Sequence, residues 1–320
     1  MTERSGLLGV ARFLFPLHSA SPPQMPGHTG RRSRRRRPGQ RSHNMGQSLR
    51  PPAASASSSE DLDTARVTWT ALPVPVQEEV LLLLPAREVV CTCRRVCRLW
   101  RDLVDSASLW KRRCAREGLR PRDPACPPAD WRVFYFLCRM RRNLLKNPRA
   151  DDEFRGWTLV SNGGDKWAIE PVGTPLPDPA VQKYFVTSYY MCLKSQLIDL
   201  VEEGYRPALL DKVQPDIVVS DWYAPRFDCA CEYHVCVQLL SQRKQVLQEF
   251  RPKPVHFEQW NDMQWHQMRH VFRQYGRGVR FVKFTHGGKD CQFWAGWYGI
   301  RVTNSLVEID PGAEEPAQPL

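Results

Sequence analysis

The chain has 320 residues, of which 42% are hydrophobic and 25% are charged, and its formal net charge is +12. This length suits about two domains. The longest apolar run, Val80–Pro85, is far shorter than the roughly 20 residues of a membrane span, so we expect no such segment. The apolar stretch Gly6–Pro16 is broken by Arg12 and lacks a clean cleavage site, so we expect no functional secretory signal.

Most of the positive charge lies in the first 44 residues, which hold nine arginines against one acid, Glu3, and so carry +8 of the +12. The run RRSRRRR at Arg31–Arg37 is the centre of this charge. It suits a nuclear address or a phosphate-binding arm, and it suits equally a solvated extension. Residues 1–68 are rich in Ser, Pro, Arg and Ala without apolar periodicity, so we expect them to be disordered.

The residue inventory gives little support to an enzyme. Eleven cysteines form no paired CxxC motif, so we expect reduced thiols, no disulfide framework and no metal site. There is no P-loop, GxSxG or GxGxxG motif, and His266 and His270 lack the glutamate of an HExxH site. Spacing alone would allow Cys229 and His234 as a nucleophile and its base, and nothing else supports that pair. We expect no catalytic residue and no cofactor.

The chain after residue 68 begins with helical spacing. Val76, Val80, Leu83 and Leu84 stand at i, i+4, i+7 and i+8, which is one face of a helix that Pro85 ends. Apolar periodicity predicts further helices over Val89–Val104, Ser106–Gly118 and Pro128–Leu145.

After Asn147 the chain changes to short alternating runs separated by Gly, Asn, Asp and Pro. Strands without interleaved helices favour an antiparallel sandwich over a parallel sheet. The predicted strands are Lys166–Pro171, Lys183–Leu193, Asp216–Tyr223, Tyr233–Leu240, His266–Tyr275 and Val279–His286. This segment extends to about residue 310, and the acidic end, residues 311–320, should be loose.

The helical stretch Leu72–Trp110 resembles an F-box. The matching features are the opening Leu72–Pro73, the pair Leu84–Pro85, the CRxVCRxWRxL pattern at Cys93–Leu103 and the following Trp110. Three short helices cannot bury all of these apolar side chains, and a leftover apolar patch is typical of a partner site. In the F-box family that patch binds the adaptor that docks the protein on a cullin–RING ubiquitin ligase.

The resemblance implies the residues that bind the adaptor. They are Leu72, Pro73, Val76, Val80, Leu83, Leu84, Pro85, Cys93, Val96, Cys97 and Trp100. Gln77 and Glu78 stand where close relatives are more apolar, and Pro75 is unusual, so we expect a lower adaptor affinity.

The second half resembles the F-box-associated domain of the sugar-recognising F-box proteins, which bind N-linked glycans and whose second domain is an antiparallel β-sandwich. The resemblance covers roughly residues 70–310. Its motifs include DWRVFYFL (Asp130–Leu137), KYFVTSYYMCLKSQLIDL (Lys183–Leu200), PDIVVSDWYAPR (Pro215–Arg226) and FWAGWYGIRVTNS (Phe293–Ser305). We therefore expect an F-box at 69–118, a helical linker at 119–147 and a jelly-roll-like, galactose-binding-like sandwich at 148–310.

In the glycan-binding relatives a Tyr–Trp pair on a loop grips the chitobiose core of N-glycans. The resemblance places that pair at Phe293 and Trp294, an aspartate from a neighbouring loop at Asp228, and an aromatic floor at Tyr189. A carboxylate there would accept charge-assisted hydrogen bonds from the sugar. Phe293 lacks the phenol hydroxyl, which removes about 1 kcal/mol of hydrogen bonding from such a site.

The neighbourhood of this pair departs from the relatives in other ways. Ala295 replaces a lysine of the best-binding relative, and Pro225 and Phe227 alter the Asp228 loop. We expect Trp297 and Tyr298 to plug the edge of the sandwich.

Two functions follow from the resemblance and both stay open. In the first, the chain is the substrate receptor of an SCF-type ligase that binds misfolded N-glycosylated proteins, with high-mannose glycans and their chitobiose core, for degradation from the endoplasmic reticulum. In the second, the pocket has lost sugar affinity and the receptor binds non-glycosylated proteins. The expected partners are the adaptor, the cullin scaffold and the substrate, with nucleic acid disfavoured. The expected location is the cytoplasm, near the cytosolic face of the endoplasmic reticulum, with a nuclear fraction if the Arg-rich run acts as an address.

Overall fold

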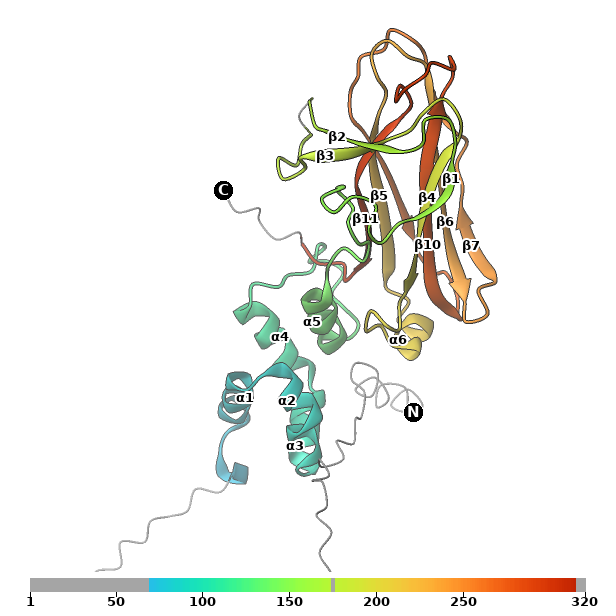
Figure 1. Ribbon diagram of the computed structural model, residues 1–320. Helices are drawn as coiled ribbons and strands as arrows, with labels where there is room; N and C mark the ends of the chain where they lie inside the picture. The colour runs from blue at the N-terminus through green and yellow to red at the C-terminus, as the bar shows by residue number, and fades with distance from the viewer. Residues whose placement is uncertain (1–68, 174–175, 315–320) are drawn as a thin grey trace, which may run out of the picture. The chain divides into compact units, whose positions relative to one another are not determined.

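The computed structural model describes residues 69–173 and 176–314, as helices followed by two β-sheets (Figure 1). The expected disordered tail at 1–68 and the last six residues lie outside these ranges. No described helix combines the length and the apolar character of a membrane span.

Short helices make up the first part. They are η2 (Trp69–Ala71), α1 (Val74–Leu83), α2 (Ala86–Cys91), η3 (Cys93–Arg95), α3 (Arg98–Asp105) and α4 (Ala107–Arg116). The expected single helix at Val89–Val104 is therefore wrong, because the chain breaks at Thr92 and again at Cys97, which has extended φ and ψ of −156° and 179°. Ser106 caps α4 by accepting a hydrogen bond from Leu109 N, and Trp110 is buried.

The expected helical linker is a packed helix, α5 (Trp131–Met140). Asp130 caps it by accepting hydrogen bonds from the backbone nitrogens of residues 132 and 133. Tyr135 and Phe136 lie 5.5 and 5.4 Å from the Trp110 ring, and Leu144 N donates to Val307 O. Helix α5 and Leu144 thus pack against the elements on either side, whereas residues 119–130 are mostly exposed.

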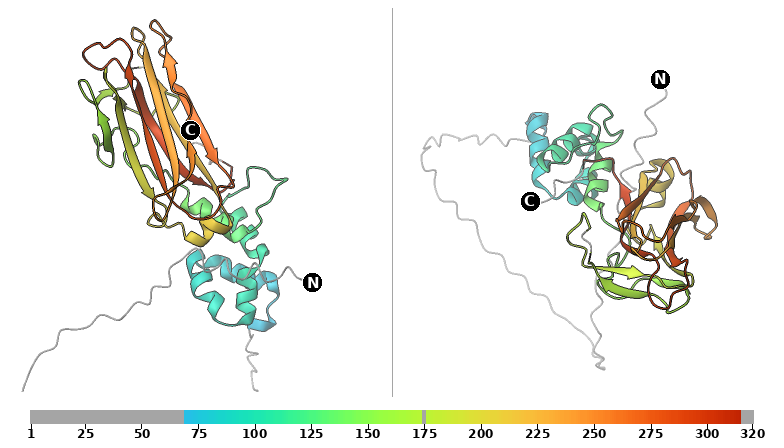
Figure 2. Two further views of the ribbon diagram at one scale, coloured as in Figure 1. Left: turned by 90° about the vertical axis from the view of Figure 1, so that its right-hand side faces the viewer. Right: turned by 90° about the horizontal axis from the view of Figure 1, so that it is seen from above.

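Two antiparallel sheets form the second part, which confirms the predicted sandwich (Figures 1 and 2). The first sheet has the order β1-β4-β10-β6-β7, with β8 also paired to β6, and the second has the order β2-β3-β11-β5-β9. The strands of the first sheet are β1 (Thr158–Asn162), β4 (Cys192–Asp199), β6 (Cys231–Ser241), β7 (Val246–Phe250), β8 (Val255–Phe257) and β10 (Val279–Asp290). Those of the second are β2 (Ala168–Pro171), β3 (Lys183–Val186), β5 (Asp216–Ala224), β9 (His266–Phe272) and β11 (Arg301–Asp310).

The predictions for the second part of the chain differ from the structure in three respects. The run Lys183–Leu193 is not one strand, because it leaves the second sheet after Val186 and enters the first at Cys192. The short helix α6 (Pro207–Lys212) and the strands β1, β7, β8 and β11 were not predicted. Residues 311–314 are not loose: Ala313 is buried and bridges Pro121, and Glu314 N donates to Arg120 O.

A polar network lies inside the sandwich and joins the two sheets. The Asp221 carboxylate on β5 accepts hydrogen bonds from Ser305 on β11 and from Tyr233 on β6, each at 2.7 Å. It also lies 2.5 Å from His286 Nδ1 on β10, whose Nε2 is 2.5 Å from Lys194 Nζ on β4. All five side chains are buried, so these bonds replace the hydration that burial removes.

Candidate functional site

The strand registers bring several loops to one end of the sandwich. Gly288 on β10 pairs with Cys192, the first residue of β4, and Asp290 pairs with Cys231, the first residue of β6. On the other sheet Arg301 pairs with both Val186 and Ala224. The loops β3–β4, β5–β6 and β10–β11 therefore lie at the same end of the sandwich.

The β10–β11 loop, residues 291–300, begins with a tight turn around Asp290. The Oδ1 atom of this buried carboxylate accepts hydrogen bonds from Gln292 N at 2.9 Å and from Phe293 N at 2.6 Å. Burial raises the pKa of Asp290, and the backbone N–H groups that face it oppose that shift. Phe293 has a φ of 57°, in the left-handed region, so the turn directs its side chain away from the strand path.

Three other loops, β1–β2, β3–β4 and β5–β6, hold the middle of the β10–β11 loop. Gly296 N donates to Asp165 Oδ2 at 2.6 Å, and Gly296 O accepts from Ser188 Oγ at 2.7 Å. Arg226 Nε donates to Trp297 O at 2.6 Å, and the same guanidinium forms an ion pair with Glu170. A Cβ at Gly299 would lie 2.1 Å from Thr187 Oγ1, so only glycine allows this close approach.

The loop presents its rings to solvent. The exposed fraction is 62% for Phe293, 37% for Trp294, 41% for Trp297 and 56% for Tyr190. Tyr190 meets Phe293 edge-on at 5.9 Å and lies 5.1 Å from the half-buried Tyr189. We call these five residues the aromatic rim. The structure thus links Tyr189 through Tyr190 to Phe293.

The expectation that Trp297 plugs the sandwich edge is wrong, because its side chain is exposed. Tyr298 is half-buried and packs edge-on beneath Trp294, with ring centroids 5.4 Å apart. Trp294 is therefore in contact with Tyr298 while part of its ring stays exposed.

Asp228 lies half-buried in the β5–β6 loop, and its backbone carbonyl accepts a hydrogen bond from Gln259 Nε2. This loop is joined to the start of the β10–β11 loop, because Cys291 N donates to Ala230 O at 2.8 Å. Within the described residues, no hydrogen bond or ion pair joins the Asp228 carboxylate to the aromatic rim. Asp228 thus belongs to the adjoining loop, as expected, while its direct partnership with Trp294 stays a prediction.

Sequence reasoning missed a second pair of rings beside Asp228. Phe227 and Trp260 are 48% and 65% exposed, and their rings meet edge-on at 5.5 Å. Trp260 has a φ of 64°. A bulky ring within a polar turn, QWNDM, is a local sequence signal that could have identified Trp260.

The predicted adaptor-binding residues are largely exposed. Val76, Val80 and Leu83 follow one face of α1 and are 44%, 38% and 74% exposed, and Val96 in the second half of the motif is 61% exposed. Pro73, Pro85 and Cys97 are also exposed, whereas Leu72, Leu84 and Trp100 are half-buried. Such apolar exposure is typical of a surface that a partner covers.

Three polar or small residues of the F-box are placed differently from expectation. Cys93 is only 6% exposed and burial raises the pKa of its thiol, so it belongs to the helical core rather than to a binding surface. Gln77 and Glu78 are buried, and Gln77 Nε2 donates to the carbonyls of Trp69 and Leu72. Gln77 and Glu78 therefore do not lie on the exposed face of α1, where they were expected to lower the affinity for the adaptor.

Cys229 does not have the character of a nucleophile. It is fully buried, and burial, followed by the charges of Asp290 and Asp228, raises the pKa of its thiol to about 12. His234 forms its hydrogen bond with Glu232 at 3.0 Å. The structure therefore gives no support to Cys229 and His234 as a catalytic pair.

Comparison with known sequences agrees with both halves of the chain. The sequence profile described as F-box-like matches residues 69–116, and the profile described as the F-box associated region matches residues 135–309. The chain is 55% identical over 249 residues to F-box only protein 6 of Bos taurus, which covers 77% of this chain and 94% of that protein. It is 52% identical over 244 residues to human F-box only protein 6, covering 75% of this chain and 83% of that protein. For human F-box only protein 44 the identity is 49% over 244 residues, covering 75% of this chain and 96% of that protein. The chain therefore belongs to the F-box only proteins that carry an F-box-associated region.

Proposed function

We propose that this chain is the non-catalytic substrate receptor of an SCF-type cullin–RING ubiquitin ligase, and that its substrates are misfolded proteins with N-linked glycans. In this proposal the exposed apolar face of the F-box binds the adaptor, and the aromatic rim with Asp228 binds the chitobiose core of a high-mannose glycan. The ligase acts by placement, because a bound substrate meets the ubiquitin-charged enzyme at a raised effective concentration. Cytosolic glycoproteins of this kind come from the endoplasmic reticulum, so the receptor works in the cytoplasm near that membrane.

The observation that carries the sugar-binding half of the proposal is the pair of exposed rings at Phe293 and Trp294. Sugars present flat C–H faces to aromatic rings and hydroxyls to fixed polar groups. The loop that bears these rings donates backbone hydrogen bonds to Asp290 and Asp165 and accepts one from Ser188. A loop fixed in advance loses less conformational entropy when it binds a ligand.

A glycan-binding measurement tests this half. The wild-type chain should be retained on immobilised high-mannose glycoprotein and released by free chitobiose. Trp294→Ala should weaken chitobiose binding at least ten-fold, which is about 1.4 kcal/mol, because the exposed indole ring is lost. Leu247→Ala removes an exposed apolar side chain on β7 and should leave binding unchanged. Equal retention of wild type and Trp294→Ala would show that the rim is not the sugar site.

Affinity purification tests the adaptor half. The wild-type chain should recover the adaptor and the cullin from cells. Leu83→Asp, at the most exposed apolar position of α1, should lose both, while Val160→Asp, at an exposed valine of β1, should retain both. Recovery of neither partner with the wild type would contradict the ligase assignment whatever the glycan measurement gives.

A receptor for non-glycosylated proteins is the second candidate, and a specific observation favours it. Phe227 and Trp260 widen the exposed apolar surface around Asp228, and Phe293 offers no hydroxyl to a sugar. Such a surface suits protein side chains as well as a sugar ring. Recovery of adaptor and cullin together with no retention on the glycan column would identify this function.

A further inference from the structure

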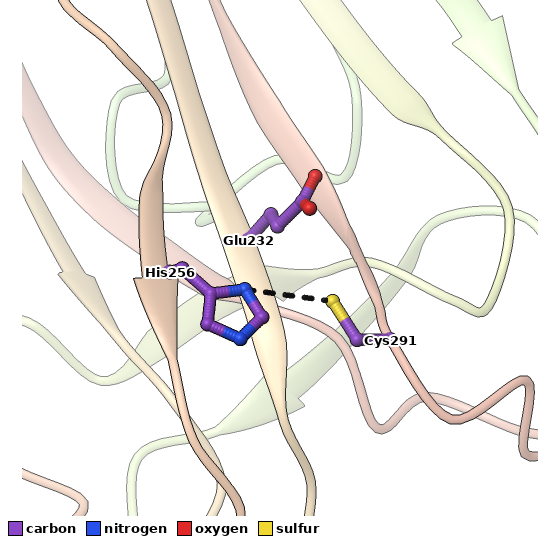
Figure 3. Close-up of side chains that lie close together, drawn as sticks. All are labelled: Glu232, His256 and Cys291. Carbon is purple, nitrogen blue, oxygen red and sulfur yellow. Dashed lines mark hydrogen bonds between the residues drawn. The ribbon is translucent and has the colours of Figure 1, made fainter.

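Three side chains with metal-ligating atoms converge beside the β10–β11 loop (Figure 3). They are Glu232, His256 and Cys291, and their ligand atoms all lie within 4.8 Å of one another. Cys291 Sγ is 3.9 Å from His256 Nδ1. Each side chain keeps some solvent exposure, so an ion can reach them.

Strand pairing fixes this arrangement. Glu232 on β6 and His256 on β8 are direct partners across an antiparallel pair, so their side chains stand on the same face of the sheet. Cys291 follows the last residue of β10, and its backbone N–H bonds Ala230 O, which holds it beside the start of β6. The three residues therefore come from three neighbouring segments with a defined register.

Two of the three side chains have a further polar partner: an acidic group beside His256 and a hydrogen bond to Glu232. His256 turns Nδ1 towards Cys291, while Nε2 lies 3.5 Å from Glu258 Oε1. A carboxylate on the second ring nitrogen is the usual companion of a metal-binding histidine. The Glu232 carboxylate is in turn held by His234 Nε2 at 3.0 Å.

The donor set suits zinc. A thiolate, an imidazole and a carboxylate are its common ligands, at about 2.3, 2.0 and 2.1 Å, which places tetrahedral ligand atoms about 3.5 Å apart. The 3.9 Å between sulfur and nitrogen needs only a small side-chain rotation to reach that distance. Lys289, the partner of Glu232 on β10, adds a positive charge nearby, but a thiolate and a carboxylate together outweigh it.

We propose that Glu232, His256 and Cys291 form a zinc-binding site, with a water or a group from a partner as the fourth ligand. The absence of a CxxC motif does not bear on it, because the ligands come from separate segments. Cys291 lies two residues before Phe293, so a bound ion would fix the chain at the point where the β10–β11 loop begins.

Zinc titration of the full chain, reduced and freed of metal, tests this site. Binding is followed by calorimetry, and cobalt serves as a probe whose thiolate gives a charge-transfer absorption. We expect one equivalent of zinc to depend on Cys291, and Cys291→Ser should weaken that equivalent at least ten-fold and remove the cobalt–thiolate band. His256→Gln, at an exposed side chain that the fold does not need, should do the same.

Cys236→Ser is the matched control, because Cys236 is also a half-buried cysteine but lies outside the cluster. It should keep both the zinc equivalent and the cobalt band. The proposal is overturned if wild type and Cys291→Ser take up the same zinc, or if Cys236→Ser loses as much as Cys291→Ser. These outcomes do not depend on glycan or adaptor binding.

Discussion

At the residue scale, Phe293 combines two properties that determine what the rim can do. Its left-handed φ and the hydrogen bond that its backbone N–H donates to Asp290 place the ring in solvent, next to Tyr190. Because it is phenylalanine and not tyrosine, the exposed ring carries no hydroxyl that could hydrogen-bond to a sugar. In the proposed sugar site the rings are thus exposed to a ligand, while the hydroxyl that would make one hydrogen bond is missing.

Phe293→Tyr should restore that bond. We expect chitobiose affinity to rise about five-fold, which corresponds to about 1 kcal/mol for one hydrogen bond. The free energy of unfolding should change by less than about 0.5 kcal/mol, because the ring is exposed. Calorimetric titration with chitobiose measures the first quantity and urea unfolding the second. Phe227→Tyr, an exposed ring on the neighbouring loop, is the control, and an equal gain there would show that the added hydroxyl acts non-specifically.

At the element scale, β10 is the strand on which the site depends, since it pairs with both β4 and β6 and continues into the aromatic loop. Its end contains Gly287 and Gly288, where neighbouring backbones come close. A Cβ at Gly288 would lie 1.8 Å from Glu232 O, which is backbone and cannot move aside.

Gly288→Ala should therefore push β6 and β10 apart at the edge of the site. We expect the free energy of unfolding to fall by about 1–3 kcal/mol, the usual effect of overpacking, and glycan binding to weaken with it. Gly173→Ala is a matched control, because a Cβ there meets nothing within 4 Å and its φ is not in the left-handed region. Its change should stay within about 0.5 kcal/mol. Urea unfolding of both variants decides the matter, and equal stabilities would show that the close approach at Gly288 is easily relieved.

The accuracy of the sequence-based predictions differs from one strand or helix to another. The runs of β6 and β10 were predicted because their buried positions largely alternate along the strand. Strand β5 is buried along most of its length, so it reads as a short apolar run instead. The run Lys183–Leu193 was wrongly predicted as one strand, because its apolar residues continue where the chain crosses from one sheet to the other. A periodic pattern does not show that the pairing strand has changed. The break at Thr92 in the F-box was missed for a similar reason, since the apolar spacing continues through it.

The site was predictable in its ring content and not in its arrangement. The family resemblance indicated Phe293 and Trp294, but only their exposure separates Trp297 from Tyr298. That exposure depends on Arg226 and Ser188, which come from distant segments. The cluster of Glu232, His256 and Cys291 gives no local sequence motif. Its residues lie far apart in the chain and only strand pairing brings them together.

At the scale of the whole sandwich, the two sheets are joined by the buried network around Asp221 as well as by apolar packing. The His286 ring is fully buried between Asp221 and Lys194 and stacks on Trp157 at 5.1 Å. Burial is the main cause that lowers the pKa of His286 to about 4, with Asp221 opposing the shift and the nearby Lys194 adding to it. Burial also lowers the pKa of Lys194 well below its ordinary value.

This network makes the stability of the sandwich depend on pH in a defined window. Unfolded His286 binds a proton below pH about 6.5, whereas the folded ring does so only below about 4, so between these values the unfolded state holds more protons. The stability that His286 contributes is complete above pH 6.5 and is lost as the pH falls to 4, by about 3 kcal/mol from this residue. Urea unfolding across that range measures the fall, and histidine NMR at pH 5 should find the His286 ring neutral. If the His286 ring titrated near pH 6.5 in the folded chain, this prediction would be contradicted. Such a result would mean that the buried network tolerates a protonated histidine.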